Sequence, residues 1–162
     1  MSPIDWAMRP LKKYADFSGR AQRAEFWWFG LLIVVLVVVA MIIENIAGLD
    51  KMFLTYGPLT LAVLLATLVP SLAVQTRRLH DTNRPGWWLV AFYVLYGIYM
   101  FLTFGSLEAI AAGDMSSVAS VGLAAIAMLI FSIVLIVFYV RKGTQGDNRY
   151  GPDPLAGEPA YA

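Results

Sequence analysis

Four long stretches with almost no charged residues constrain this chain more than any other feature of its sequence. They run approximately over residues 26–48, 55–74, 86–107 and 118–140, and of the 12 basic and 11 acidic residues they contain only Glu44. Each is long enough to cross a bilayer as a helix, which takes about 20 residues. Because 59% of the residues are hydrophobic, a water-soluble fold would expose apolar patches that soluble monomers rarely carry. We therefore predict an all-α, polytopic membrane protein with a bundle of four transmembrane helices.

The positive charges predict how these spans are oriented. Eleven of the 12 Lys and Arg residues lie before the first span, between the second and third spans, or after the fourth, whereas the other two loops contain only Lys51. Under the positive-inside rule, both termini and the middle loop belong in the cytoplasm of a bacterial inner-membrane protein. This divides the chain into a cytoplasmic leader (1–25), a transmembrane domain (26–140) and a Gly/Pro-rich cytoplasmic tail (141–162), with disorder expected beyond Leu155.

The leader contains a short amphipathic segment that we expect to begin at Pro10. Leu11 and Tyr14 lie on one helical face of this segment, and Lys12 and Lys13 lie on another. Such a segment is typical of an interfacial helix, with its cations toward anionic headgroups. The alternative is an unstructured basic leader that serves only to set the topology.

A turn is predicted at Ser18-Gly19, where Ser18 is also a candidate cap for the helix leading into the first span. We expect Arg20, Arg23 and Glu25 to lie on that helix. Glu25 is close enough to the membrane that leaving it unpaired would be costly.

The partner of Glu25 is therefore expected to be an arginine. We favour Arg77 or Arg78 over the local Arg20 and Arg23, because the middle loop folds back against the first span in a compact bundle.

Three ordered motifs carry most of the polar chemistry. They read FSGRAQRAEFWWF from Phe17, RRLHDTNRPGWW from Arg77 and GTQGDNRYGPDP from Gly143. Together they resemble the "domain of unknown function 805" family of small bacterial inner-membrane proteins. The resemblance runs from about Leu11 to Pro154, and it implies a fold and a location but no established activity.

Residue types exclude several kinds of site. The chain has no cysteine and one histidine, His80, so a thiolate or multi-histidine metal site cannot form; we expect no metal and no cofactor. The pair His80-Asp81 invites a general-base interpretation, but no nucleophile or metal motif accompanies it. We favour a structural, hydrogen-bonded turn, with contact to a phosphate or headgroup as the alternative.

Glu44 is the one charged residue within a span. It lies 18 residues after Phe26, about 27 Å along a helix, which places it near the outer interface. We expect it to extend toward the headgroups together with Asn45; the alternative is a buried ion or proton site.

Pro70 interrupts the second span. Proline has no N–H, so it leaves the carbonyl of Ala66 without its helical partner and kinks the helix. We expect the hydroxyls of Thr67 and Ser71 to compensate.

The leading functional hypothesis is a non-catalytic protein whose Arg/Trp-rich cytoplasmic face binds anionic lipid headgroups or a protein partner, because guanidinium groups bind phosphates with two hydrogen bonds and indole rings favour the headgroup level. A homo-oligomer is possible, and nucleic acid is excluded because the basic residues are held at the bilayer. The alternative is a small transporter or channel subunit, indicated by Glu44, Pro70 and the stripe Tyr93, Tyr96 and Tyr99; a membrane enzyme comes third. The candidate binding residues are Arg20, Arg23, Glu25, Trp27, Trp28, Arg77, Arg78, His80, Asp81, Arg84, Trp87, Trp88, Asn148 and Tyr150.

Overall fold

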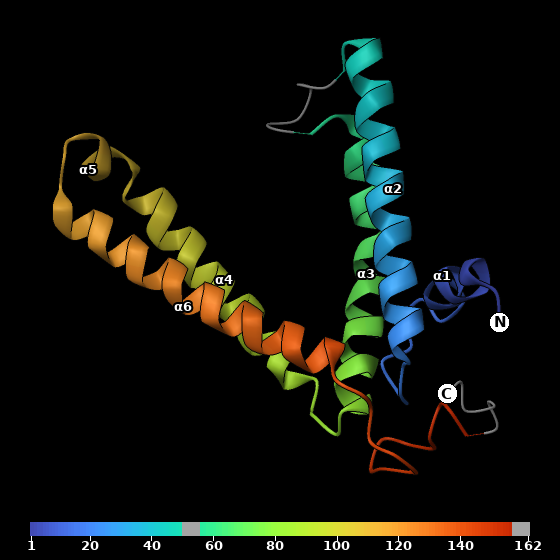
Figure 1. Cartoon of the computed structure of the whole chain (residues 1–162). Coiled ribbons are helices and arrows are strands. Elements are labelled where there is room, and N and C mark those ends of the chain that lie inside the picture. The colour runs from blue at the N-terminus through green and yellow to red at the C-terminus, as the bar shows by residue number, and fades with distance from the viewer. Residues whose placement is uncertain (50–55, 157–162) are drawn as a thin grey trace. The chain divides into compact units, whose positions relative to one another are not determined.

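Helices make up all the regular structure in the computed structural model, which describes residues 1–49 and 56–156 (Figure 1). Four of them are long and apolar enough to cross a membrane, which confirms the predicted fold class. The helices are α1 (Pro3–Lys12), α2 (Arg23–Ala47), α3 (Pro58–Asp81), α4 (Trp87–Gly105), α5 (Leu107–Ala111) and α6 (Met115–Val140). The disorder predicted for the end of the tail falls on residues 157–162, outside the described residues.

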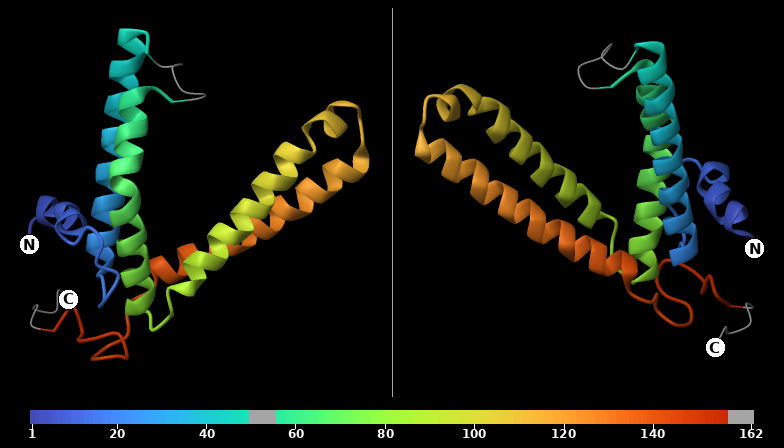
Figure 2. Two further views of the ribbon diagram at one scale, coloured as in Figure 1. Left: turned by 180° about the vertical axis from the view of Figure 1, so that it is seen from behind. Right: turned by 45° about the horizontal axis from the view of Figure 1, so that its top comes forward.

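Two compact units divide the chain. The first contains residues 1–83 and the tail from Lys142, and the second contains Arg84–Arg141. Within the first unit α2 and α3 lie side by side, and within the second α4 lies beside α6 (Figures 1 and 2). The first unit therefore contains the leader, the tail and the first two spans. The predicted division into leader, transmembrane domain and tail at residues 25 and 140 is based on the polarity of the sequence and stays a prediction.

The long helices turn most of their apolar side chains outward. Val34, Leu65, Val90 and Leu129 are each more than half exposed, as expected where lipid is the solvent. Between α2 and α3 the packing is tight, with a small core in which Phe29 and Val74 are 1% exposed.

The leader forms a true helix, α1, which confirms the predicted helical leader but not its start. Ser2 accepts a hydrogen bond from the backbone N–H of Asp5, and the Asp5 carboxylate accepts one from the N–H of Ser2. This reciprocal cap starts the helix at Pro3, and Pro10 lies inside the last turn rather than at the beginning. Pro10 and Trp6 are buried, and α1 packs on α2.

The segment between α1 and α2 is extended and differs from the predicted helix. Gly19 has φ +74°, so the turn is confirmed. The cap is wrong: Ser18 donates to Asp16 Oδ1 over 2.5 Å, and α2 begins only after Gln22. Arg20 consequently lies before the helix, and its side chain donates hydrogen bonds to the tail. These Ser18 hydrogen bonds lower the pKa of Asp16 and keep it ionised at neutral pH.

Tyr14 supplies the partner that Pro70 removes. Its hydroxyl donates to the carbonyl of Ala66 over 2.8 Å, the carbonyl left free by the proline. The hydroxyl of Thr67 instead donates to Val63 O at 2.7 Å, so the predicted compensation by Thr67 is wrong. The end of the leader is thus hydrogen-bonded to α3 one turn before Pro70.

We expect Tyr14→Phe to lower the free energy of unfolding by about 0.5–1.5 kcal/mol, the usual worth of one hydrogen bond. The same change should cost less in a Pro70→Ala background, because alanine at position 70 restores the backbone donor for Ala66. Unfolding in detergent of the four members of this cycle measures the difference. Equal losses in both backgrounds would contradict the link between the hydroxyl and the proline.

Glu44 does not extend to the headgroups, so that prediction is wrong. Its side chain is buried, with the residue 1% exposed, and it accepts hydrogen bonds from Thr60 N at 2.8 Å and Thr60 Oγ1 at 2.6 Å. The first N–H groups of α3 have no helical acceptor, and hydrocarbon offers none. A carboxylate also complements the positive end of the helix dipole. Glu44 of α2 therefore caps α3, whereas Asn45 is exposed.

The second span continues further than hydropathy predicts. Helix α3 ends at Asp81 rather than near residue 74, so Arg77, Arg78, His80 and Asp81 lie in its last two turns and not in a loop. The turn follows them, with Asn83 at φ 57°. This extension places both arginines on a rigid element that faces α2.

Candidate functional site

Three segments that are distant in sequence meet where α2 begins and α3 ends; we call this region of the first unit the polar end. Ala21 N donates to Arg77 O over 3.1 Å and Thr144 N donates to Asp81 O over 2.8 Å. The amide of Asn148 donates to His80 O over 3.0 Å. The three motifs of the sequence therefore pack together.

Asp81 holds two buried arginines. Arg20 Nε donates to Asp81 Oδ1 over 3.0 Å, and Arg78 NH1 donates to the other oxygen, Oδ2. The arginines approach from the segment before α2 and from the preceding turn of α3. Arg78 is 0% and Asp81 4% exposed. A single carboxylate thus serves two guanidinium groups away from solvent.

The tail is hydrogen-bonded to Arg20 of this ion pair. Arg20 donates from NH1 to Gly146 O at 2.6 Å and from NH2 to Thr144 O at 2.5 Å. Gln22 donates to Pro154 O at 2.5 Å. Gly143 lies so close that a Cβ there would sit 2.6 Å from Asp81 Cγ. A glycine is therefore required where the tail passes the carboxylate.

Glu25 pairs with Arg77, as predicted. The distance from Arg77 NH2 to Glu25 Oε1 is 2.7 Å, and the two side chains are 0% and 2% exposed. A second cation, Arg9 of α1, lies 3.6 Å from Glu25 Oε2 and was not predicted. Arg77 also donates to the carbonyl of Asp16, so this ion pair joins α2, α3 and the leader.

His80 and Asp81 have separate partners. The His80 ring stacks on Tyr150, with centroids 3.9 Å apart and planes 3° apart. His80 Nδ1 lies 3.1 Å from Gly19 O, an acceptor, which favours the tautomer with the proton on Nδ1. Asp81 orients arginines rather than this imidazole, so the pair lacks the geometry of a carboxylate that positions a general base.

The remaining predicted residues are aromatic or lie in the second unit. Trp27 and Trp28, at the start of α2, are 49% and 39% exposed. In the second unit the rings of Trp87 and Trp88 stack 5.1 Å apart, and the guanidinium of Arg84 lies 3.7 Å over the ring of Phe138. Trp88 also packs edge-on against Phe138, with ring centroids 5.2 Å apart, so these four residues form one cluster within the second unit.

The structure corrects the exposure expected of the arginines. Arg77 and Arg78 are 0% exposed and Arg20 is 8% exposed, so these three lie inside the polar end rather than on its surface. Arg23 is exposed. The reason is that α3 extends to Asp81, so the arginines of its last turns face α2 and are buried. Removing them from water is costly unless acidic side chains pair with them there.

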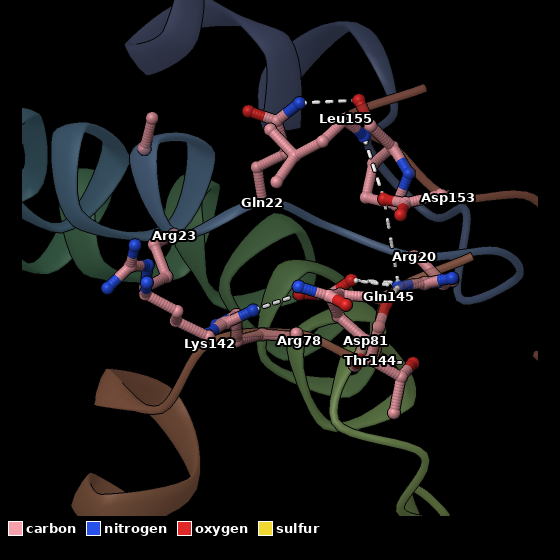
Figure 3. A pocket seen from close by; sticks show the side chains of 13 residues that line it. Arg20, Gln22, Arg23, Arg78, Asp81, Lys142, Thr144, Gln145, Asp153 and Leu155 are labelled. Carbon is pink, nitrogen blue, oxygen red and sulfur yellow. Dashed lines mark hydrogen bonds and ion pairs between the residues drawn. The ribbon is translucent and has the colours of Figure 1, made fainter. Parts of the chain in front are cut away.

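A cavity of about 610 Å³ opens beside the arginine pair (Figure 3). It lies between the start of α2, the end of α3 and the tail. Hydrogen bonds from the backbone N–H groups of Leu155 and Gly146 lower the pKa of one lining acid, Asp153, which is therefore ionised at neutral pH. The polar lining residues are Arg20, Gln22, Arg23, Arg78, Asp81, Lys142, Thr144, Gln145 and Asp153.

Sequence reasoning missed five of these: Gln22, Lys142, Thr144, Gln145 and Asp153. The available signal was the Gly/Pro-rich tail itself, since turns that are otherwise unexplained often carry binding residues. Lys142 was interpreted only as a topological anchor.

The fold and the site define a class: an all-helical membrane protein with four spans and a buried arginine–carboxylate network holding its tail. The chain belongs to the family described as "Protein of unknown function (DUF805)", which matches residues 14–152. It is similar to the inner membrane protein YhaI of Escherichia coli (strain K12), with 34% identity over 154 residues, 95% of this chain and 98% of that protein. The inner membrane protein YhaH of the same strain is 30% identical over 93% of this chain and 97% of its own length. The uncharacterised protein YiiR is 28% identical over 85% of each chain. No solved structure matches.

Proposed function

We propose that this protein is a non-catalytic inner-membrane protein whose polar end faces the cytoplasm and binds anionic lipid headgroups. The observation that carries the proposal is an excess of cations after the ion pairs have formed. Among residues 1–49 and 56–156, Lys12, Arg23 and Lys142 take part in no ion pair. Anions from outside the protein are the natural partners of such cations at a bilayer surface.

The exposed tryptophans support a position of the polar end at the level of the lipid headgroups. Trp27 and Trp28 lie in the first turns of α2 beside Arg23, and indole rings prefer the headgroup level. A cation one turn from this ring pair reaches lipid phosphates without leaving the interface. The leader adds Lys12 on the exposed side of α1.

The orientation rests on the positive-inside rule and is testable because the chain contains no cysteine. We expect Gln145→Cys in the tail to react with a membrane-impermeant maleimide only after the inner membrane is opened. Ala111→Cys, at the exposed end of α5, should react in spheroplasts. The reverse pattern would contradict a cytoplasmic tail.

Headgroup binding predicts a lipid preference. We expect the purified protein in mild detergent, offered equal amounts of phosphatidylglycerol, cardiolipin and phosphatidylethanolamine, to retain the two anionic lipids preferentially in native mass spectra. Raising the ionic strength should weaken retention, since salt screens exposed charges. Equal retention of all three lipids would oppose the proposal and favour a protein partner for the same surface.

A transporter or channel subunit is the second candidate, and the buried carboxylate of Glu44 is the observation that favours it. Both oxygens of Glu44, however, accept hydrogen bonds from Thr60. Capping α3 explains this carboxylate without a transported ion, so we rank the binding function first.

A further inference from the structure

The charges around the cavity at the polar end do not balance. Its lining includes two acids, Asp81 and Asp153, against four cations: Arg20, Arg23, Arg78 and Lys142. Asp81 is shared by Arg20 and Arg78, and Asp153 approaches only Arg20, at 4.0 Å. The lining therefore carries an excess of two positive charges, which attracts an anion from outside the protein.

The cations of the cavity divide into two kinds. Arg20 directs its donors to Asp81 and to carbonyls of the tail, so it forms part of the wall. Within the described residues, the side chains of Arg23 and Lys142 have no hydrogen bond or ion pair, and both are exposed. In Figure 3 they occupy one side of the view and the Arg20–Asp81 ion pair the other. They are the groups available to a ligand.

These groups select for phosphate chemistry. A guanidinium group offers two parallel N–H donors that match two phosphate oxygens, and an ammonium group adds a compact charge. Gln145, also on the lining, carries an amide that can bind an ester or hydroxyl oxygen. Both kinds of contact suit a phosphate ester better than a simple halide.

The volume indicates more than a bare ion. About 610 Å³ falls in the range of roughly 300–1,000 Å³ that is usual for sites of small organic ligands. Ala24, Pro154 and Leu155 supply apolar surface on the lining, on which the carbon part of an ester can rest.

We propose that this cavity is a binding site for a phosphate ester, with Arg23 and Lys142 as its phosphate ligands. The inference deepens the proposed function and rests on it for the lipid source of the ester. A glycerophosphate headgroup and a soluble glycerol phosphate share this chemistry, and the experiment below separates them.

The test compares two double variants of the full chain with equal loss of charge. Arg23→Gln/Lys142→Gln removes the cavity ligands. Lys13→Gln/Arg149→Gln removes two cations that do not line the cavity and that already bond to Asp16 and to the carbonyl of Asn83. Binding of phosphatidylglycerol is measured by native mass spectrometry, and binding of glycerol phosphate by calorimetry in detergent. Both substituted pairs are exposed or half-buried, so the midpoint of thermal unfolding should stay near that of the wild type.

We expect the cavity variant to bind its probe at least about tenfold more weakly, as loss of charged hydrogen bonds implies, and the affinity of the control variant to change by about twofold or less. Arg23→Lys should restore only part of the affinity, because an ammonium group cannot make the paired contact. Loss of phosphatidylglycerol alone identifies a lipid ligand, and loss of glycerol phosphate binding identifies a soluble one.

Failure of the cavity site and failure of the proposed function give different results. If the wild type prefers anionic lipid and the cavity variant binds it equally well, the cavity is not the site but headgroup binding stands. If the wild type shows no lipid preference yet binds glycerol phosphate through Arg23 and Lys142, headgroup binding fails and the cavity site stands. Binding of neither probe rejects both.

Discussion

Replacing Asp81 by asparagine should lower the free energy of unfolding by about 3–5 kcal/mol, the usual cost of leaving buried charges without their partner. Asparagine keeps the size of the side chain but removes the negative charge that Arg20 and Arg78 share. Both arginine side chains are at most 1% exposed, so water cannot replace the lost carboxylate. We expect this to be the most damaging single isosteric change at the polar end.

Thermal unfolding in detergent measures the effect. Each kcal/mol corresponds to about 2–4 °C in a chain of this size, so the expected drop is large. Glu108→Gln makes the same chemical change at an exposed position and should stay within about 0.5 kcal/mol of wild type. Similar unfolding midpoints for the Asp81→Asn and Glu108→Gln variants would show that the carboxylate is not needed to hold the two guanidinium groups.

A substitution in the tail should disturb the same carboxylate of Asp81. In Gly143→Ala the new Cβ would lie 2.6 Å from Asp81 Cγ, whereas at Gly122 an added Cβ meets no atom within 4 Å. Gly143→Ala should therefore destabilise the protein and release the tail, and Gly122→Ala should not. Limited proteolysis of the tail separates these outcomes, since the released segment becomes cleavable.

Hydropathy and charge were sufficient to predict the four long helices, because each span is a long run with at most one charged residue and lipid imposes helical backbone pairing. They failed at the end of the second span. Arg77 and Arg78 are charged residues of the kind expected in a loop. Only their ion pairs with Glu25 and Asp81 make a helical, buried position favourable. The contact between Arg77 and Glu25 joins residues 52 positions apart in the chain, and hydropathy carries no information about it.

Contacts of the site were predictable where the cost of burying one charged residue indicated which kind of partner it needs. Glu25 near the membrane needs a cation, and this argument led to Arg77 or Arg78, of which Arg77 is the partner. The argument could not find Arg9, whose position depends on how α1 packs, nor Lys142 and Asp153, whose positions depend on the path of the tail. The cost of desolvating a charged group predicts the type of residue that pairs with it. The tertiary structure decides which residue of that type is the partner.

The error at Glu44 has the same origin. Depth along α2 places this residue near the outer end of the span, where extension to the headgroups is the usual outcome. The start of α3 lies against that end and presents N–H groups that hydrocarbon leaves unsatisfied. Glu44 meets this need from the neighbouring helix, a contact that no local pattern indicates.

The last prediction tests this cap through a pair of residues. Glu44→Ala should lower the unfolding midpoint by about 2–8 °C, because losing an N-cap costs about 1–2 kcal/mol. Glu44→Gln should do less harm, since its amide oxygen still accepts from Thr60 N and its NH₂ group can donate to Thr60 Oγ1. Gly57→Ala should resemble Glu44→Ala, because the added Cβ would lie 2.6 Å from Glu44 Oε2 and displace the carboxylate.

The double variant Glu44→Ala/Gly57→Ala then decides the mechanism. Without the carboxylate there is nothing for the Cβ to displace, so the double variant should unfold near the same temperature as Glu44→Ala alone, a strongly non-additive result. Gly97→Ala serves as the control, because an added Cβ there meets no atom within 4 Å. If the losses at positions 44 and 57 instead add, Gly57 acts through its own backbone and the carboxylate of Glu44 does not cap α3.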